Sequence, residues 1–107
     1  MPWIVKLIPR DLDDYYTLLE IVDEVCENDD TLQYDFFKPY IYIVVMEGRE
    51  GEKAKDRAYK IGVWFNKKAR DGERLLEPKF AVYYRRLKWD SSKWRYIIES
   101  KEDIDEK

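Results

Sequence analysis

Histidine is absent from this sequence, so the side chain that most often acts as a general base or a metal ligand is missing. Cysteine occurs once, as Cys26, which excludes an intramolecular disulfide and gives no sign of an oxidising compartment. Cys26 stands close to Asp23, Glu24 and Glu27, and neighbouring anions raise the pKa of a thiol and weaken it as a nucleophile. We therefore expect Cys26 to be a core residue, and we expect no catalytic residue, no metal site and no cofactor.

Uncharged polar residues are also scarce: the chain has one Gln, two Asn, three Ser and two Thr. Charged side chains make up 40% of the residues, against about 25% in an average soluble domain. Using charges in place of amides and hydroxyls is typical of hyperthermophile proteins, because ion hydration becomes less favourable on heating and amides are chemically labile. The composition therefore predicts a thermophilic source, archaeal or viral, with an ordinary charge-rich chain as the alternative.

Long hydrophobic runs are missing as well. The longest uncharged apolar run, Tyr40 to Met46, is far shorter than the ~20 residues that span a bilayer. The chain does not open with a basic region and an apolar stretch, and Asp11 comes early, which is unlike a secretory signal peptide. We expect a soluble, cytoplasmic protein without membrane contact. With 107 residues, 45% of them hydrophobic, the chain can form one domain with a single core.

The beginning of the chain predicts a strand followed by a helix. Residues 3–8 are apolar and β-branched and lie between two prolines, which is typical of a short strand. Asp11 is a suitable N-cap, and Asp13 and Asp14 suit the positive end of the helix dipole. The helix is predicted to end at residues 28–30. Its apolar residues recur on one face at helical spacing, namely Leu12, Tyr15, Leu19, Val22 and Cys26.

Beyond that helix the sequence predicts only strands and loops. Short β-branched and aromatic segments alternate with charged, glycine-containing loops, which is typical of antiparallel strands. The expected segments are an extended stretch at 32–37, strands at 40–46, 57–66, 80–89 and 94–100, and a frayed charged tail at 101–107.

This order of elements favours a single α+β domain over residues 1–100. A strand, one helix and four antiparallel strands are most simply arranged with the helix packed across a twisted antiparallel sheet. The layout resembles that of cystatins in topology alone. The sequence has no cystatin motif, and a shared fold does not imply a shared function.

One enzyme class stays open from the residues, a metal-dependent nuclease. The tripeptides Glu77-Pro78-Lys79 and Glu99-Ser100-Lys101 match the Glu-x-Lys pattern with which such enzymes bind a metal ion and polarise water. A chain this rich in Glu and Lys produces such matches by chance, and no matching upstream Asp at the end of a strand is evident. The nuclease is therefore the least favoured function.

Charge is segregated along the chain. Residues 11–37 contain ten acidic and no basic side chains, whereas residues 49–95 contain fifteen basic and seven acidic ones. The basic half is also rich in aromatic residues, and this combination suits single-stranded nucleic acid, since rings stack on bases and cations neutralise phosphates. Separate lobes of opposite charge in the folded protein would favour a binding function, and a patchwork would favour internal charge pairing.

A predicted hairpin near the end of the chain supplies candidate nucleic-acid-binding residues. A four-residue loop at 90–93 would pair Trp89 with Trp94 and give the hairpin one apolar face. The other face would carry one ring for stacking on a base and three cations for phosphates, namely Tyr84, Arg86, Lys88 and Arg95. The alternative is an ordinary hairpin stabilised by cross-strand aromatic pairs, with Lys and Arg as solubilising residues.

The strand at 40–46 is apolar on both faces, although one helix can cover only one face of a sheet. Ile41, Ile43 and Val45 point one way, and the opposite face carries Tyr40, Tyr42, Val44 and Met46. Large apolar patches seldom stay exposed, so the uncovered face is predicted to contact a second subunit or a partner. We expect a homodimer through a sheet face or edge, with burial under the long loops as the alternative.

The net charge of −3 and the pI near 5.1 work against general nucleic-acid affinity. The sequence therefore favours a non-enzymatic binding, adaptor or inhibitor-type protein, including those of mobile elements, that acts through an unidentified protein partner. The contact would be the uncovered sheet face or the acidic face of the helix, formed by Glu20, Asp23, Glu24 and Glu27. A single-stranded nucleic-acid-binding module is the alternative.

Overall fold

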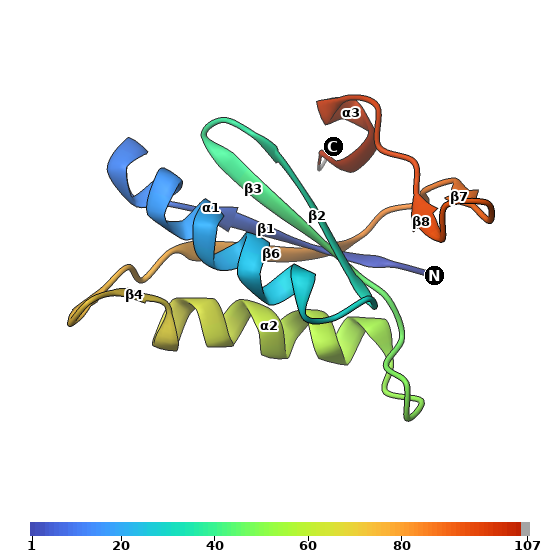
Figure 1. Cartoon of the computed structure of the whole chain (residues 1–107), viewed down its shortest axis with the longest axis horizontal. Helices are drawn as coiled ribbons and strands as arrows, with labels where there is room; N and C mark the ends of the chain where they lie inside the picture. The colour runs from blue at the N-terminus through green and yellow to red at the C-terminus, as the bar shows by residue number, and fades with distance from the viewer. Residues whose placement is uncertain (106–107) are drawn as a thin grey trace.

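The computed structural model of the protein describes residues 1–105. Four strands and two long helices form its body: β1 (Trp3–Ile8), α1 (Leu12–Glu27), β2 (Leu32–Phe37), β3 (Tyr40–Val45), α2 (Ala54–Lys68) and β6 (Lys79–Tyr84). The short elements are β4 (Arg70–Asp71), β5 (Arg74–Leu75), β7 (Trp89–Asp90), β8 (Arg95–Tyr96) and α3 (Lys101–Ile104). Figure 1 shows α1 and α2 running in opposite directions on the same side of the sheet.

The sheet has the order β2-β3-β1-β6, and every neighbouring pair is antiparallel. Val5 of the central strand β1 lies opposite Ile43 of β3 on one side and Val82 of β6 on the other. Each helix connects two parallel strands that have a third strand between them, so the topology is the βαββαβ, ferredoxin-like one. The predicted α+β class is confirmed, as are the first helix and the strands at 3–8, 32–37 and 40–45.

Residues 57–66 were expected to form a strand, and this prediction was wrong because they belong to α2. Their alternating apolar residues suggested a period of two, but the residues that the helix buries are Ala54, Ala58, Gly62 and Phe65, which lie on one helical face. Asp56 in the first turn and Lys67 in the last suit the helix dipole. The sheet therefore carries two helices on this face instead of one.

The end of the chain also differs from the prediction. β6 ends at Tyr84, and the later strands shrink to the two-residue pair β7 and β8, in which Trp89 lies opposite Tyr96 rather than Trp94. Residues 101–104 form α3 instead of a frayed tail, with a capping box between Ser100 and Asp103. Residues 106 and 107 of the predicted tail lie outside the described residues.

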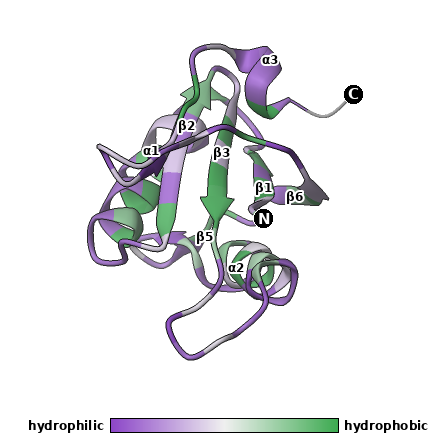
Figure 2. Ribbon diagram, turned by 90° about the vertical axis from the view of Figure 1, so that its right-hand side faces the viewer, coloured by the Kyte–Doolittle hydropathy of each residue, from purple (hydrophilic) through white to green (hydrophobic). Residues whose placement is uncertain are grey.

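Both faces of the sheet are buried, each in its own core. On the helix side, α1 and α2 cover Val5, Leu7, Ile41, Ile43 and Val45. On the other side, the segment after β6 crosses the sheet and covers a second core (Figure 2), formed by Ile4, Tyr42, Val44 and Ile104 with Leu87, Tyr96 and Ile98 packed against it.

This covering segment changes the interpretation of the predicted dimer face. Tyr42 and Val44 have no exposed surface, and Tyr40 and Met46 are half-buried. The face is buried within the chain, as in the alternative to the dimer, but the cover is the segment after β6 and not the long loops that were expected.

Asp105 fastens the covering segment to the sheet. Its Oδ1 accepts a hydrogen bond of 2.6 Å from the Tyr42 hydroxyl and one of 3.3 Å from Lys6 Nζ. The Lys6 ammonium in turn lies 4.1 Å from the centre of the Tyr40 ring. The hydrogen bond from Tyr42 and the ion pair with Lys6 keep the pKa of Asp105 below its usual value, so the carboxylate stays charged.

A second buried carboxylate, Asp14, fastens the β4–β5 hairpin to α1. Asp14 is 3% exposed, and its carboxylate accepts hydrogen bonds from Arg74 at 2.7 Å and from Arg10 at 3.4 Å. Arg10 also donates to the Leu75 carbonyl at 3.0 Å. The hydrogen bond from Arg74 lowers the pKa of Asp14 against the opposing effect of burial.

The second core is expected to be essential to the fold, and Ile104→Ala tests this. Ile104 has no exposed surface, and removing such a side chain costs about 2–5 kcal/mol. Urea unfolding at neutral pH measures the loss, with the exposed Glu102→Ala as a matched control in the same helix that stays within ~0.5 kcal/mol of the wild type. Equal effects of the two substitutions would mean that α3 contributes nothing to the core.

Asp14 predicts a definite pH dependence of stability. A carboxyl whose pKa is lowered by folding stabilises the protein above its unfolded pKa of about 3.9, and this contribution disappears as the pH falls through the folded value. Asp14→Asn should therefore lower the urea midpoint at pH 6, and its deficit relative to the wild type should shrink below about pH 4. The exposed Glu73→Gln is the control; a deficit for Asp14→Asn that is independent of pH would contradict the prediction.

Candidate nucleic-acid interface

The acidic helix α1 begins at the N-cap Asp11, whose carboxylate accepts a 2.8 Å hydrogen bond from the Asp14 backbone. Its predicted partner face is Glu20, Asp23, Glu24 and Glu27, and none of the four forms an ion pair within residues 1–105. Asp23 accepts a 2.5 Å hydrogen bond from the Tyr34 hydroxyl, which raises the pKa of that tyrosine to about 12. Three of the four carboxylates of this face thus stay without a recorded partner within residues 1–105.

The predicted basic residues lie on the other side of the sheet from α1. The residues of α1 pack into the core with Val5 and Ile43, whereas the chain after β6 packs on Ile4 and Val44. The acidic groups of α1 and the basic groups of the segment after β6 therefore lie on opposite faces. The sheet lies between them.

The β7–β8 hairpin carries most of the exposed aromatic surface on the basic side. The edge of the Trp89 ring contacts Trp94 at a centroid distance of 6.0 Å and Tyr96 at 4.9 Å. Trp94 is 78% exposed, and Trp89 is 38% exposed. We call Arg86, Lys88, Trp89, Lys93, Trp94, Arg95 and Tyr96 the aromatic–basic hairpin.

The turn of this hairpin is held by Asp90. Its carboxylate accepts hydrogen bonds from the Ser92 hydroxyl at 2.7 Å and from the backbone N–H groups of Ser92 and Lys93. These hydrogen bonds lower the pKa of Asp90, and the bond from the Ser92 hydroxyl has the largest effect. The turn places Trp94 at φ 54°, a left-handed conformation that is unusual for a bulky residue, and the ring projects into solvent.

Gln33 anchors the hairpin to the sheet. This side chain of β2 is 8% exposed, donates to the Tyr96 carbonyl at 2.9 Å and accepts from the Tyr96 backbone N–H at 2.8 Å. The Ile97 N–H also bonds to the Lys88 carbonyl at 2.8 Å. A primary amide is well suited to this position because it offers an acceptor to the N–H and a donor to the carbonyl of one residue.

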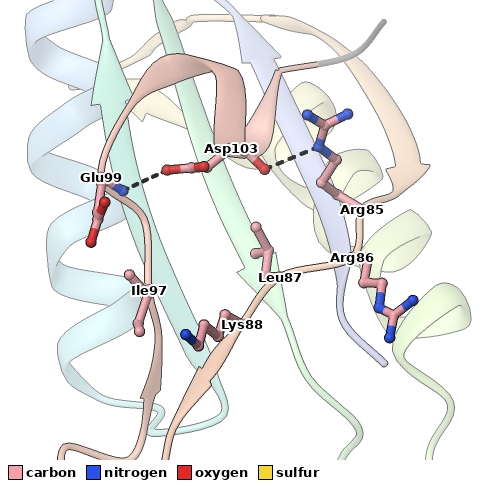
Figure 3. A pocket seen from close by; sticks show the side chains of 7 residues that line it. All are labelled: Arg85, Arg86, Leu87, Lys88, Ile97, Glu99 and Asp103. Carbon is pink, nitrogen blue, oxygen red and sulfur yellow. Dashed lines mark hydrogen bonds between the residues drawn. The ribbon is translucent and has the colours of Figure 1, made fainter.

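A groove of about 590 Å³ adjoins the hairpin, lined by Arg85, Arg86, Leu87, Lys88, Ile97, Glu99 and Asp103. Figure 3 shows the Arg86 and Lys88 side chains projecting in different directions from their shared segment. Arg85 is occupied, because it donates to the carbonyls of Asp103, at 3.0 Å, and Glu102. The Asp103 carboxylate is occupied as well by the N–H groups of Glu99 and Ser100.

The structure brings only part of the predicted nucleic-acid set together. Arg86 and Lys88 line the groove, and Arg95 is exposed on β8 opposite Asp90. Tyr84 lies elsewhere, on the helix side of the sheet, where its ring packs edge-on against Trp3 at 6.1 Å. Side chains alternate between the two faces only as far as the end of β6 at Tyr84. The prediction that Tyr84 and Arg86 lie on the same face of one strand was therefore wrong.

Trp94 is the residue that the sequence argument overlooked. The expected register buried it as the partner of Trp89 on an apolar face, and the actual register places it in the turn, two positions away from the paired residue. The Asp90-Ser-Ser sequence just before it carried the missing signal, because Asp and Ser form side-chain-stabilised turns.

The other candidate chemistry has little support in the geometry. Cys26 packs against the core, where burial, with Asp29 and Asp23 nearby, raises its pKa to about 12. Lys101, from one of the Glu-x-Lys tripeptides, pairs with Asp105 at 3.7 Å. Within the described chain no three His, Cys, Asp or Glu side chains are grouped so that they could hold a metal ion. No helix there is long and apolar enough to cross a membrane.

Comparisons with protein-family models, with curated proteins and with solved structures find no match to this chain. The interpretation of the site therefore rests on its own residues and geometry.

Gln33 predicts how firmly the hairpin is held. Gln33→Met keeps the side-chain length but leaves the N–H and carbonyl of Tyr96 without partners, which costs about 1–3 kcal/mol for buried groups. Hydrogen exchange of the Tyr96 amide should accelerate by roughly tenfold or more, while the amides of β1 keep their protection. Unchanged exchange at Tyr96 would mean that the covering segment is held in place without Gln33.

Proposed function

We propose that the protein is a non-enzymatic binding module for single-stranded nucleic acid and that the aromatic–basic hairpin is its contact surface. The observation that carries the proposal is a highly exposed tryptophan, Trp94, flanked in the sequence by the exposed Lys93 and Arg95 on the face of the sheet opposite the acidic helix. The sequence ranked this function second, after a protein-binding module. Burial of Tyr42 and Val44 removes one of the two surfaces on which that first choice depended.

The cations support the proposal because they are free to bind phosphate. Arg86, Lys88, Lys93 and Arg95 are all exposed, and none of them forms an ion pair or side-chain hydrogen bond within residues 1–105. By contrast, Arg57 and Lys6 elsewhere in the fold are paired with carboxylates. A phosphate that approaches the hairpin therefore breaks no existing ion pair, and it gains counterion release from each contact.

The rings support a single strand rather than a duplex. An unpaired base can stack on an exposed aromatic face, and such stacking is sequence-tolerant because every base has a π-face. Trp89 already contacts the Trp94 ring edge to face, so little of the freedom of that ring is lost on binding. Bases inside a duplex are already stacked on each other and offer no such face.

Two sets of acidic groups oppose nucleic acid. Glu99 lines the groove and has no recorded side-chain partner within the described chain, so it repels phosphate locally. The carboxylates of α1 act from behind the sheet, and at about 0.1 M salt a Debye length of roughly 10 Å weakens their field. The proposal therefore implies modest affinity that increases when Glu99 is neutralised.

Binding to a fluorescent oligothymidine tests the proposal. Trp94→Ala should weaken binding by about 1–3 kcal/mol, the usual contribution of a stacked base, and leave the salt slope unchanged. Arg86→Ala should flatten the slope of log affinity against log salt, about −3 for four phosphate contacts, by roughly 0.7. Glu99→Gln should strengthen binding, and Tyr84→Ala should have no effect because that ring lies on the other side of the sheet.

Absence of saturable binding at ~50 mM salt would overturn the proposal, as would a loss with Tyr84→Ala that exceeds the loss with Trp94→Ala. The oligonucleotide should also stay intact with Mg²⁺ or Mn²⁺. Cleavage abolished by Glu77→Gln or Lys79→Ala would instead establish the nuclease that the Glu-x-Lys tripeptides suggest.

A protein partner is the second candidate function, and the acidic surface of α1 favours it. Glu20, Glu24 and Glu27 are exposed, and no basic residue lies within α1. A basic protein surface would complement these carboxylates. The same chain offers such a surface on α2.

A further inference from the structure

The outer surface of the helix layer is divided between two helices of opposite charge. α1 contains six acidic and no basic residues, and α2 contains five basic residues and one acidic residue. The lysines of α2, namely Lys55, Lys60, Lys67 and Lys68, are exposed, and no ion pair within residues 1–105 involves them. The two helices therefore do not neutralise each other within one molecule.

The same surface exposes apolar side chains of α2. Tyr59, Val63 and Trp64 are 47%, 48% and 44% exposed. On α2 these residues line a shallow depression of about 470 Å³ together with Lys60, Lys67 and Lys68. A helix face with apolar residues inside a rim of lysines suits an acidic amphipathic helix.

A groove of about 490 Å³ separates the two helices near the C-terminal end of α1. Val25 of α1 and Ile61, Trp64 and Phe65 of α2 line it, so these positions come level along the layer. The helices are antiparallel (Figure 1) and rise equally per residue. Five residues before Val25 is Glu20, which therefore comes level with Asn66, next to Lys67, five residues after Ile61. Two residues after Val25 is Glu27, which comes level with Tyr59, next to Lys60.

We propose that a second copy of this chain covers the helix layer, with α1 of each protomer packed on α2 of its partner. A two-fold axis parallel to the helices exchanges the two positions and brings Glu20 of one protomer toward Lys67 of the other. A two-fold axis across the helices would instead put α1 on α1 and α2 on α2, which like charges oppose. This inference specifies the partner of the second candidate function and is independent of the nucleic-acid surface.

The interface is small, so the dimer should be weak and sensitive to salt. A helix of this length extends about 24 Å, and two helices side by side, each about 10 Å across, give a footprint on the order of 500 Å² per protomer. That value lies at the lower limit of specific interfaces. Asp56, on the rim of the groove, adds a like charge opposite the partner's α1.

Sedimentation equilibrium of the full chain over a concentration series measures the association. In 50 mM salt the mass should approach twice the 13.1 kDa of one chain, and it should return to the monomer value in about 0.5 M salt as the charges are screened. Trp64→Ala should weaken the dimer at least tenfold, whereas Trp94→Ala, on the far side of the sheet, should leave it unchanged.

A charge swap tests the pairing of α1 with α2. Lys60→Glu with Lys67→Glu reverses the charge at two positions of α2, and Glu20→Lys with Glu24→Lys reverses it at the positions of α1 that face them in the dimer. Each double variant alone should be monomeric, because these positions then face like charges. A one-to-one mixture of the two should form a heterodimer, since both contacts in the mixed pair are between opposite charges. Circular dichroism of each variant verifies the fold.

Several outcomes would overturn the dimer. A wild-type chain that remains monomeric at millimolar concentration in low salt would do so directly. Double variants that dimerise as well as the wild type would indicate packing of α1 on α1 or a different surface. Masses that grow without limit would indicate an open, head-to-tail assembly. None of these results bears on oligonucleotide binding, which uses the opposite face of the sheet.

Discussion

The strands β1 and β3 are apolar on both faces, and the rest of the structure depends on covering both. Two helices cover one face, because Val5, Ile41 and Ile43 need partners there. The opposite face, with Ile4 and Tyr42 fully buried, has to be covered by some other part of the molecule. At roughly 25 cal/mol for each Å² of apolar surface removed from water, leaving that face exposed would cost a small domain much of its net stability.

The chain meets this requirement with residues 85–104, and the position of the candidate site follows from it. The covering segment starts at the edge strand β6, crosses the sheet and meets β2, where Gln33 holds the backbone of Tyr96. Its residues Leu87, Tyr96 and Ile98 pack on the sheet, and the turn between β7 and β8 is left to face solvent. The exposed Trp94 and its neighbouring cations are thus displayed by a segment whose first role is to complete the core.

The same layering keeps the charges apart. The acidic residues come early in the chain and lie on α1, and much of the basic surface comes after β6 and lies beyond the sheet. α2 is the exception, since it places basic residues next to α1. No described segment covers the outer side of α1 and α2. The charged residues of the two helices are therefore accessible to a partner chain.

Local signals in the sequence sufficed for the first half of the fold. Asp11 as N-cap and the apolar face of α1 specify that helix independently of the rest of the chain. The apolar run 40–45 is stable in water only as a buried strand. The α+β class and the charge segregation followed from the same local information. In α2 the helical spacing of the small and apolar residues Ala54, Ala58 and Phe65 indicated a helix. The alternation of Tyr59, Ile61 and Val63 indicated a strand and led to the wrong prediction.

The site itself could be predicted only in part. Arg86, Lys88 and Arg95 were found because free cations in a basic, aromatic segment are visible in the sequence. Tyr84 was misplaced, and Trp94 was missed, because a hairpin register depends on where the strand leaves the sheet. The sequence by itself determined which residues are apolar on both faces, charged or helix-forming, since these are properties of short segments. Only the tertiary structure decided that residues 85–104 close the second face, because that choice depends on contacts between Gln33, Tyr42 and residues more than sixty positions away.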